Sequence, residues 1–366
     1  MGNLSDVQIG QELKINPVNN DIYTKTYHSQ ILNIGKRELR ISIPYVNGRL
    51  IPLGAGTQIK VIINSETFDS EVISRELGHE KSLIIATPHS IFRGNRVNNK
   101  TKVISITSGK GGVGKSTLSI NLAIAMSKLG KKVCLIDADL GMANIDVLLK
   151  MTPKMNLTHI INNEAENIFD VIVEGPEGVL IVPGSSGWQN IANLKDRQFQ
   201  RLIKAFNELE QYTDIILFDT GAGINNNIIN FLLASDEVLL VTTPEPHAIT
   251  DAYAMIKVIM EQKKDLGVKL IVNKTSTPKE GSNVGNKISF ASNKFLGVSM
   301  EYLGCVQENQ SFIKSSKNQT PILQNQPNSK TAKEIKDLAS SLIGEKNKPS
   351  SGMVGFIKKL TGLFKK

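Results

Sequence analysis

A glycine-rich stretch with two lysines, at residues 109–117, has the composition of a phosphate-binding loop. From Gly109 to Ser116 it satisfies the pattern G-x-x-x-x-G-K-[ST], between an apolar run and a helix-like segment. Its glycines allow backbone N–H groups to converge on phosphate oxygens, and the following helix adds its positive N-terminal end. We expect Lys115 to reach the β- and γ-phosphates and Ser116 to ligate Mg²⁺. The predicted nucleotide-binding residues of this loop are Gly109, Lys110, Gly111, Gly112, Val113, Gly114, Lys115, Ser116 and Thr117.

Carboxylates end two later apolar runs and could serve the same site. Asp137 and Asp139 stand at i and i+2 at the end of one strand-like run, so both can face the phosphates from one side of the chain. Asp219 ends the run 215–219 and precedes Thr-Gly-Ala-Gly, which is typical of a Walker B strand. We expect Asp219 to hold the Mg²⁺ shell, and Gly223 to let the backbone approach the γ-phosphate.

The elements that would position these residues indicate a doubly wound α/β domain over residues 103–344. Apolar runs alternate there with helical periodicities such as 116–129 and 248–263. Continuous apolar strands indicate burial on both faces, which a mostly parallel sheet flanked by helices provides. The expected fold is therefore that of a P-loop NTPase. Its expected strands are 103–107, 133–137, 179–182, 215–219, 238–242, 270–273 and 302–306.

Residues 1–95 have a different texture and are predicted to be all-β. Short β-rich runs recur between turn residues, which favours a small barrel or sandwich. A polar linker at 96–102 separates this domain from the α/β domain, and a second linker at 345–352 follows it. The length of 366 residues also favours two folded units.

Composition limits where such a protein works. The two cysteines, Cys134 and Cys305, lie in apolar runs and indicate buried thiols in a reducing compartment. No export signal is visible, and no apolar run approaches the roughly 20 residues that span a bilayer. We therefore expect a cytoplasmic protein.

The C-terminal segment, residues 353–366, has the pattern of an interfacial amphipathic helix. Apolar residues recur at helical spacing on one face, and lysines occupy the flanks and the other face. Part of the net charge of +9 lies here, and anionic lipid would contribute roughly 1 kcal/mol per lysine. Packing on the protein's own core, or on a partner, is the alternative. The apolar positions are Met353, Phe356, Ile357, Leu360, Leu363 and Phe364.

The loop from Lys110 to Thr117 resembles the deviant Walker A motif of the MinD/ParA ATPases, because of its additional lysine at position 110. The resemblance implies that Lys110 contacts nucleotide in a partner subunit, so that ATP closes a homodimer. It also implies that Asp139 positions the attacking water, that Asp137 assists near the metal and that Asn273 reads the adenine edge. ATP and Mg²⁺ are the implied cofactors, with slow intrinsic turnover.

Three stretches are similar to one branch of this family, FlhG (FleN), which regulates flagellar number. They are residues 218–224, 243–253 and 295–304. The implied partners are an FlhF-type GTPase and flagellar switch (C-ring) proteins, with a polar location on the inner face of the membrane. The N-terminal helix by which FlhG proteins stimulate FlhF has no counterpart here, which puts that activation in doubt.

The N-terminal residues resemble the N-terminal barrel of YcgR-like flagellar brake proteins at three stretches, 9–13, 41–44 and 84–88. Those proteins bind cyclic di-GMP through an R-x-x-x-R linker and a PilZ domain. Here two residues separate Arg93 from Arg96, where the R-x-x-x-R motif has three, and no PilZ domain follows. We therefore expect a protein-docking module rather than cyclic di-GMP binding.

Other functions remain open from the sequence. A ParA-like ATPase that positions DNA or cargo would bind nucleic acid through a basic dimer face, although nucleic acid is the weaker candidate partner. A MinD-like division-site regulator is a second alternative. A regulatory adaptor with no turnover is disfavoured, because Asp139 and Asp219 are both present.

Overall fold

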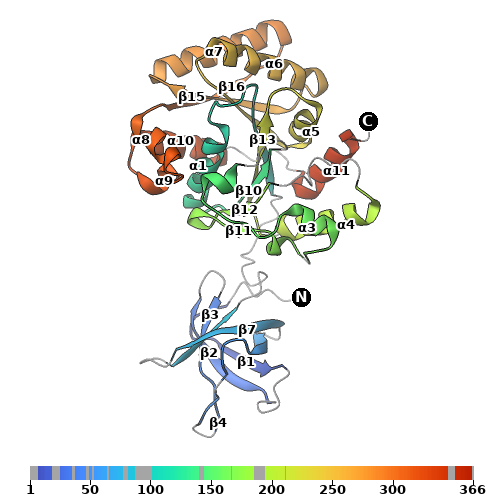
Figure 1. Cartoon of the computed structure of the whole chain (residues 1–366), viewed down its shortest axis with the longest axis vertical. Helices are drawn as coiled ribbons and strands as arrows, with labels where there is room; N and C mark the ends of the chain where they lie inside the picture. Colours follow the sequence, from blue (N-terminus) through green and yellow to red (C-terminus); the bar gives the residue numbers. More distant parts are fainter. Residues whose placement is uncertain are drawn as a thin grey trace. The chain divides into compact units, whose positions relative to one another are not determined.

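The chain forms two compact units, Met1–Asn98 and Asn99–Lys366, in a computed structural model of the protein (Figure 1). In the described part of the chain, no helix is long and apolar enough to cross a membrane. The structure describes residues 7–18, 25–34, 38–46, 49–51, 53–63, 66–76, 81–86, 101–139, 144–165, 167–184, 194–210, 212–344 and 351–364.

The first unit is a closed antiparallel barrel with strand order β1-β2-β3-β8-β7-β6. Closure comes from pairing between the first and last strands of this order, with Lys14 opposite Ile62, so that each of the six described barrel strands has a paired strand on both sides. Side chains alternate along the strands, so that Leu13 and Ile15 are buried while their neighbours are exposed. The strands are β1 (Glu12–Pro17), β2 (Tyr27–Ile34), β3 (Glu38–Ser42), β6 (Gln58–Ile63), β7 (Glu66–Glu76) and β8 (Ser82–Ala86), with a separate ribbon of β4 (Tyr45–Val46) and β5 (Arg49–Leu50).

The second unit is built on an eight-stranded sheet of order β11-β12-β10-β13-β9-β14-β15-β16. Only the edge pair β11 and β12 is antiparallel. Burial of every residue from Val133 to Ala138, together with parallel pairing to β12 and β13, confirms that the apolar run 133–137 is a central parallel strand. The strands are β9 (Lys102–Ser108), β10 (Val133–Ala138), β11 (Val173–Glu174), β12 (Leu180–Val182), β13 (Ile215–Ala222), β14 (Glu237–Thr242), β15 (Gly267–Thr275) and β16 (Glu301–Gln307).

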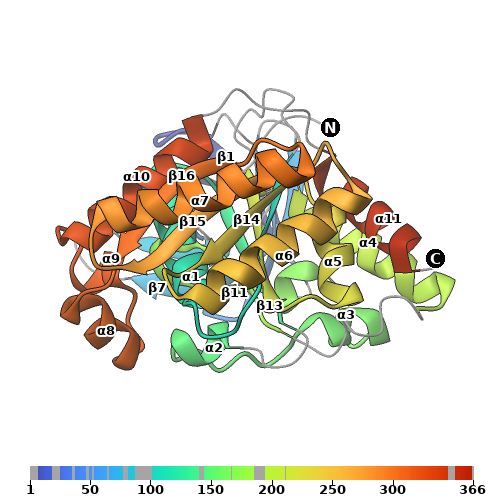
Figure 2. The same ribbon diagram turned by 90° about the horizontal axis from the view of Figure 1, so that it is seen from above.

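Helices cover both faces of this sheet, and Figure 2 shows α6 and α7 side by side over one of them. One core brings α1, α9 and α10 against the sheet, while other cores bring α4, α11, α5, α6 and α7. The helices are α1 (Lys115–Lys128), α2 (Ile145–Leu148), α3 (Leu157–Asn162), α4 (Asp196–Glu210), α5 (Asn226–Ala234), α6 (Pro246–Gln262), α7 (Pro278–Leu296), α8 (Gln310–Lys317), α9 (Ile322–Asn325), α10 (Lys330–Gly344) and α11 (Gly352–Phe364), with short 3₁₀ turns η3 (Ile168–Asp170) and η4 (Pro176–Gly178).

The direction in which the chain adds strands to the sheet reverses at β9. The strands β10 to β13 lie on one side of β9, and β14, β15 and β16 lie on the other side. Open α/β sheets bind ligands at the carboxyl ends of strands beside such a switch point. The loop that follows β9, residues 109–114, therefore lies where a ligand crevice is expected.

The C-terminal helix α11 packs on the second unit, beside α5 and α4 (Figure 1). Its residues Met353, Phe356, Ile357 and Leu360 are fully buried. At its N-terminal end, Asp236 accepts hydrogen bonds from the backbone N–H of Ser351 at 2.9 Å and from its hydroxyl at 2.8 Å. The face that we expected to meet lipid is thus buried in the protein, which is the alternative left open by the sequence. Insertion of this apolar face into a membrane would require the helix to leave its position.

Candidate functional site

The glycine-rich loop joins β9 to α1, and its backbone needs the glycines that the motif supplies. Gly112 and Gly114 have φ of 80° and 87°, a region that other residues rarely adopt. A Cβ atom on Gly114 would lie 2.5 Å from Nδ2 of Asn273, and one on Gly109 would lie 2.5 Å from the backbone of Asp251. The loop is therefore fixed both by its conformation and by close neighbours on β15 and α6.

Lys115 connects this loop to the end of β13. Its Nζ lies 2.8 Å from Oδ1 of Asp219, and both side chains are buried. The hydroxyl of Ser119, one turn further along α1, donates to the same carboxylate oxygen at 2.9 Å. The predicted phosphate-binding lysine and the predicted Walker B aspartate thus form one buried pair.

Asp137 is a buried carboxylate at the end of β10, directly opposite Asp219 in the paired strand. It accepts backbone hydrogen bonds from Asp139 at 3.1 Å, Asn144 at 2.9 Å and Ile145 at 3.1 Å. Burial nevertheless raises the pKa of Asp137 to about 6, and the negative charge of Asp219 acts in the same direction. A cation placed between these two carboxylates would relieve both effects.

Asp139 lies one residue beyond β10 and close to the second acidic strand end. Its Oδ1 lies 3.3 Å from the position of a Cβ atom on Gly221. Gly223, with φ of 89°, donates its backbone N–H to the carbonyl of Ser108 at 2.9 Å. The residues after β10 and β13 that were predicted from separate motifs therefore come together around the loop.

The second loop lysine, Lys110, binds a carboxylate of its own subunit. Its Nζ lies 2.8 Å from Oε2 of Glu245, which follows β14. Both side chains are substantially exposed, at 43% for Lys110 and 60% for Glu245. Their hydrogen bond and mutual charge raise the pKa of Lys110 and lower the pKa of Glu245.

Asn273, in β15, lies beside the loop with an unused acceptor. Its Nδ2 donates to the carbonyl of Val113 at 2.8 Å, while its buried Oδ1 has no hydrogen-bond partner among the described residues. Leaving a buried acceptor unpaired is costly. A ligand N–H placed there would satisfy it.

Every predicted site residue lies at the carboxyl edge of one of the strands β10, β13, β9 and β15. Ser116 and Thr117 begin α1, with Lys115 as the first helical residue. Sequence reasoning missed Ser119, Glu245 and Lys274, whose Nζ donates to the carbonyl of Gly112 at 2.9 Å. The position of Ser119 one turn after Lys115 was an available signal, whereas the other two contacts depend on tertiary placement.

No group of three or more His, Cys, Asp or Glu side chains that could hold a metal occurs in the described ranges. At the strand edge, Asp137 and Asp219 supply two carboxylates, and Mg²⁺ is usually held by one or two carboxylates together with phosphate oxygens and water. The residues present therefore suit Mg²⁺ that arrives with a nucleotide.

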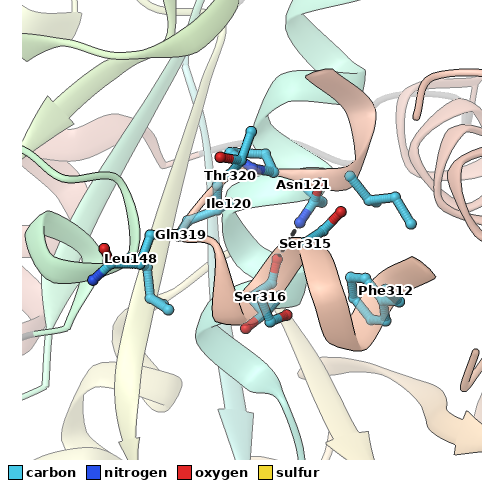
Figure 3. Close-up of a pocket in the computed structure, with 11 residues that line it drawn as sticks. Ile120, Asn121, Leu148, Phe312, Ser315, Ser316, Gln319 and Thr320 are labelled. Atoms are coloured by element: carbon cyan, nitrogen blue, oxygen red, sulfur yellow. Dashed lines mark hydrogen bonds between the residues drawn. The ribbon is translucent and has the colours of Figure 1, made fainter. Parts of the chain in front are cut away.

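A small cavity lies further along α1, between this helix and α8 (Figure 3). Asn121 of α1 faces it together with Ser315 and Ser316 of α8. Its volume of about 20 Å³ holds a single water molecule. It is too small for a nucleotide, so the candidate site remains the strand edge.

Two protein families match the chain. One is described as an AAA domain and matches residues 101–272, and the other is described as flagellar protein YcgR and matches residues 8–88. The second match covers the closed barrel.

The chain is also similar to characterised flagellar and division proteins. It is 40% identical to the antiactivator FleN of Pseudomonas aeruginosa, over 66% of this chain and 86% of that protein. It is 37% identical to the flagellum site-determining protein YlxH of Helicobacter pylori, over 75% of this chain and 94% of that protein. The solved structure of the septum site-determining protein MinD of Pyrococcus horikoshii, in complex with Mg-ADP, superposes with a TM-score of 0.53, at 27% identity over 66% of this chain and 96% of that one.

Proposed function

Because the chain belongs to the MinD/ParA family of P-loop ATPases, in the group that contains FleN and YlxH, we propose that it is an ATP-driven switch that controls flagellar number or placement by dimerising and by binding the membrane. One observation carries this proposal. Lys110, Lys115 and Asp219 lie at the same edge of the sheet, in a chain that is 40% identical to a flagellar antiactivator.

In the proposed site, Lys115 leaves Asp219 and binds the β- and γ-phosphates of ATP. Ser116 and Asp219, with Asp137 beside them, would hold Mg²⁺, and its charge would neutralise negative charge on the transferred phosphoryl group. Asp139 positions the attacking water, and Gly223, which carries no side chain, lets the backbone approach the γ-phosphate. The unpaired Oδ1 of Asn273 supports a role in accepting the amino group of adenine.

A homodimer completes this site through Lys110. Lys110 is the additional lysine that distinguishes this loop from the general phosphate-binding pattern, and its side chain is 43% exposed. In the proposed dimer it reaches the nucleotide of the second subunit. Turnover in one subunit is slow until a partner completes the arrangement.

Membrane binding is proposed to use α11. Its buried apolar face and the exposed Lys358 and Lys359 suit the interface of an anionic membrane once the helix is released. One copy binds weakly, but a dimer presents two copies, and the second engages at high effective concentration. Nucleotide state would thereby control residence on the inner face of the cytoplasmic membrane, at a cell pole or flagellar base.

The proposed protein partners are an FlhF-type GTPase and flagellar C-ring proteins. The barrel supports a docking role, since its family match is to a flagellar protein.

Mass measurement in solution tests the switch directly. The purified chain is expected to be monomeric without nucleotide and with ADP, and dimeric with a non-hydrolysable ATP analogue and Mg²⁺. Lys110→Gln should bind the analogue and remain monomeric. In cells, deletion of the gene should change the number or position of flagella, and Lys110→Gln should fail to restore them.

Two results would redirect the proposal. Analogue-dependent, salt-sensitive DNA binding would favour a ParA-like positioning ATPase. A division defect with normal flagella would favour a MinD-like role.

A further inference from the structure

Glu245 occupies the N-cap position of α6 but does not cap that helix with its side chain. A side chain that caps a helix, usually Asp, Asn, Ser or Thr, accepts a hydrogen bond from an N–H group of the first turn. Here the carboxylate instead accepts the 2.8 Å hydrogen bond from Lys110. In the free subunit, the carboxylate of Glu245 thus contacts the phosphate loop and not the N–H groups of its own helix.

The charges around this pair make Glu245 the principal partner of Lys110. Asp251 of α6 acts on Lys110 only through its charge at longer range. On the other side, Lys274 and His247 act on Glu245 through their charges without a hydrogen bond to it. The ammonium group of Lys110 is therefore held by one specific carboxylate in a mixed-charge surface.

Contacts hold the backbone of the phosphate loop in place, so a change of partner by Lys110 involves its side chain alone. Gly109 packs against the backbone of Asp251, and Lys274 binds the carbonyl of Gly112. The backbone on both sides of Lys110 is fixed in this way to α6 and β15. An exposed ion pair between two long side chains is weak, so either group can exchange its partner at little cost in free energy.

We infer that Glu245 is a positioning residue that holds Lys110 within its own subunit and releases it to a second copy of this chain. The inference rests on the proposed ATP-dependent dimer, in which Lys110 crosses to the other subunit. When the pair opens, the carboxylate of Glu245 remains at the N-terminal end of α6, where the helix dipole favours a negative charge. Release of the lysine is thus compensated within the subunit, and the pair opposes dimerisation only modestly.

The test is the concentration of a non-hydrolysable ATP analogue at which half of the full-length chain is dimeric, measured by analytical ultracentrifugation with Mg²⁺. In Glu245→Gln this concentration should fall by between about 1.5-fold and 5-fold, the range expected for loss of one exposed ion pair. Asp251→Asn is the matched control, since it removes a neighbouring acid that makes no hydrogen bond to Lys110, and it should leave the midpoint unchanged.

Steady-state turnover gives a second readout that a merely structural role would not change. Glu245→Gln should lower the ATP concentration for half-maximal turnover and leave the maximal rate unaltered, because the pair exists only before dimerisation. ADP binding, which needs one subunit only, should match that of the natural chain.

The outcomes separate this inference from the proposed function. If the natural chain dimerises but the midpoint of Glu245→Gln is unchanged or higher, Glu245 does not restrain Lys110. Equal shifts in Glu245→Gln and Asp251→Asn would show a general charge effect and would also overturn the inference. If the natural chain stays monomeric with the analogue, the proposed dimer fails and the inference falls with it.

Discussion

Phe356 of the C-terminal helix stacks on Phe218, the residue immediately before Asp219 in β13. The two ring centroids are 4.6 Å apart and the rings are inclined by 19°. Since successive residues of a strand point to opposite faces, β13 carries the docking contact of α11 on one face and the partner of Lys115 at the next residue. The attachment of α11 and the charge pair of the nucleotide site therefore share one strand.

Phe356→Ala is expected to loosen α11 without unfolding the sheet. Truncation of a fully buried phenylalanine costs about 3–5 kcal/mol, and α11 is the element that depends most directly on this ring. Backbone amides of 352–364 should exchange with solvent roughly 100-fold faster, a factor that corresponds to about 3 kcal/mol. Hydrogen exchange measured by mass spectrometry reads this segment. The exposed neighbour Lys358→Ala is the control, and equal protection in both variants would show that the ring does not hold the helix.

Asp137 predicts a pH dependence of stability in the metal-free protein. Its pKa of about 6 in the folded state lies above the ordinary value of about 3.9, so the folded state binds this proton more tightly than the unfolded state. The stabilisation is fully present below about pH 4 and is lost as pH rises through about 6. A shift of about two pKa units corresponds to roughly 3 kcal/mol.

The difference in unfolding free energy between the natural chain and Asp137→Asn isolates this group. Measured in EDTA, the natural chain should lose stability relative to the variant between pH 4 and pH 6, and the difference should then level off. Curves that stay parallel over this range would contradict a raised pKa at Asp137.

Gly114→Ala should abolish nucleotide binding. The left-handed backbone costs an alanine about 1–2 kcal/mol, and its Cβ would also lie 2.5 Å from Nδ2 of Asn273. Gly130→Ala is the matched control, because Gly130 has φ of 83° but open space around the added atom. Isothermal titration with Mg-ADP should show no binding for Gly114→Ala and ordinary affinity for Gly130→Ala. Comparable affinity in the two variants would show that the contact with Asn273 does not shape the loop.

Much of the fold followed from local patterns in the sequence. The strands β9, β10 and β13 are buried on both faces, so their apolar runs are continuous and easily recognised. The loop motif fixes Lys115 and Ser116 by spacing alone, because its geometry is local.

The contacts that could not be predicted from local patterns join residues that are far apart in the chain. The amphipathic pattern of α11 specifies an apolar face but not what covers that face, and protein core and lipid satisfy the same pattern. Glu245 meets Lys110 from a position 135 residues away, and no spacing rule connects them. The buried pair of Lys115 with Asp219 likewise required the register of α1 against β13.

Liposome co-sedimentation tests the central claim most directly, with anionic vesicles and with ATP, ADP or no nucleotide. The full chain is compared with a chain truncated at Ser351 and with the double variant Lys358→Glu, Lys359→Glu, which alters exposed positions that α11 does not use for docking. The account predicts that ATP alone brings the full chain to the vesicles and that truncation or charge reversal abolishes this binding. Binding that is the same with and without nucleotide would show that α11 is not an ATP-controlled membrane anchor.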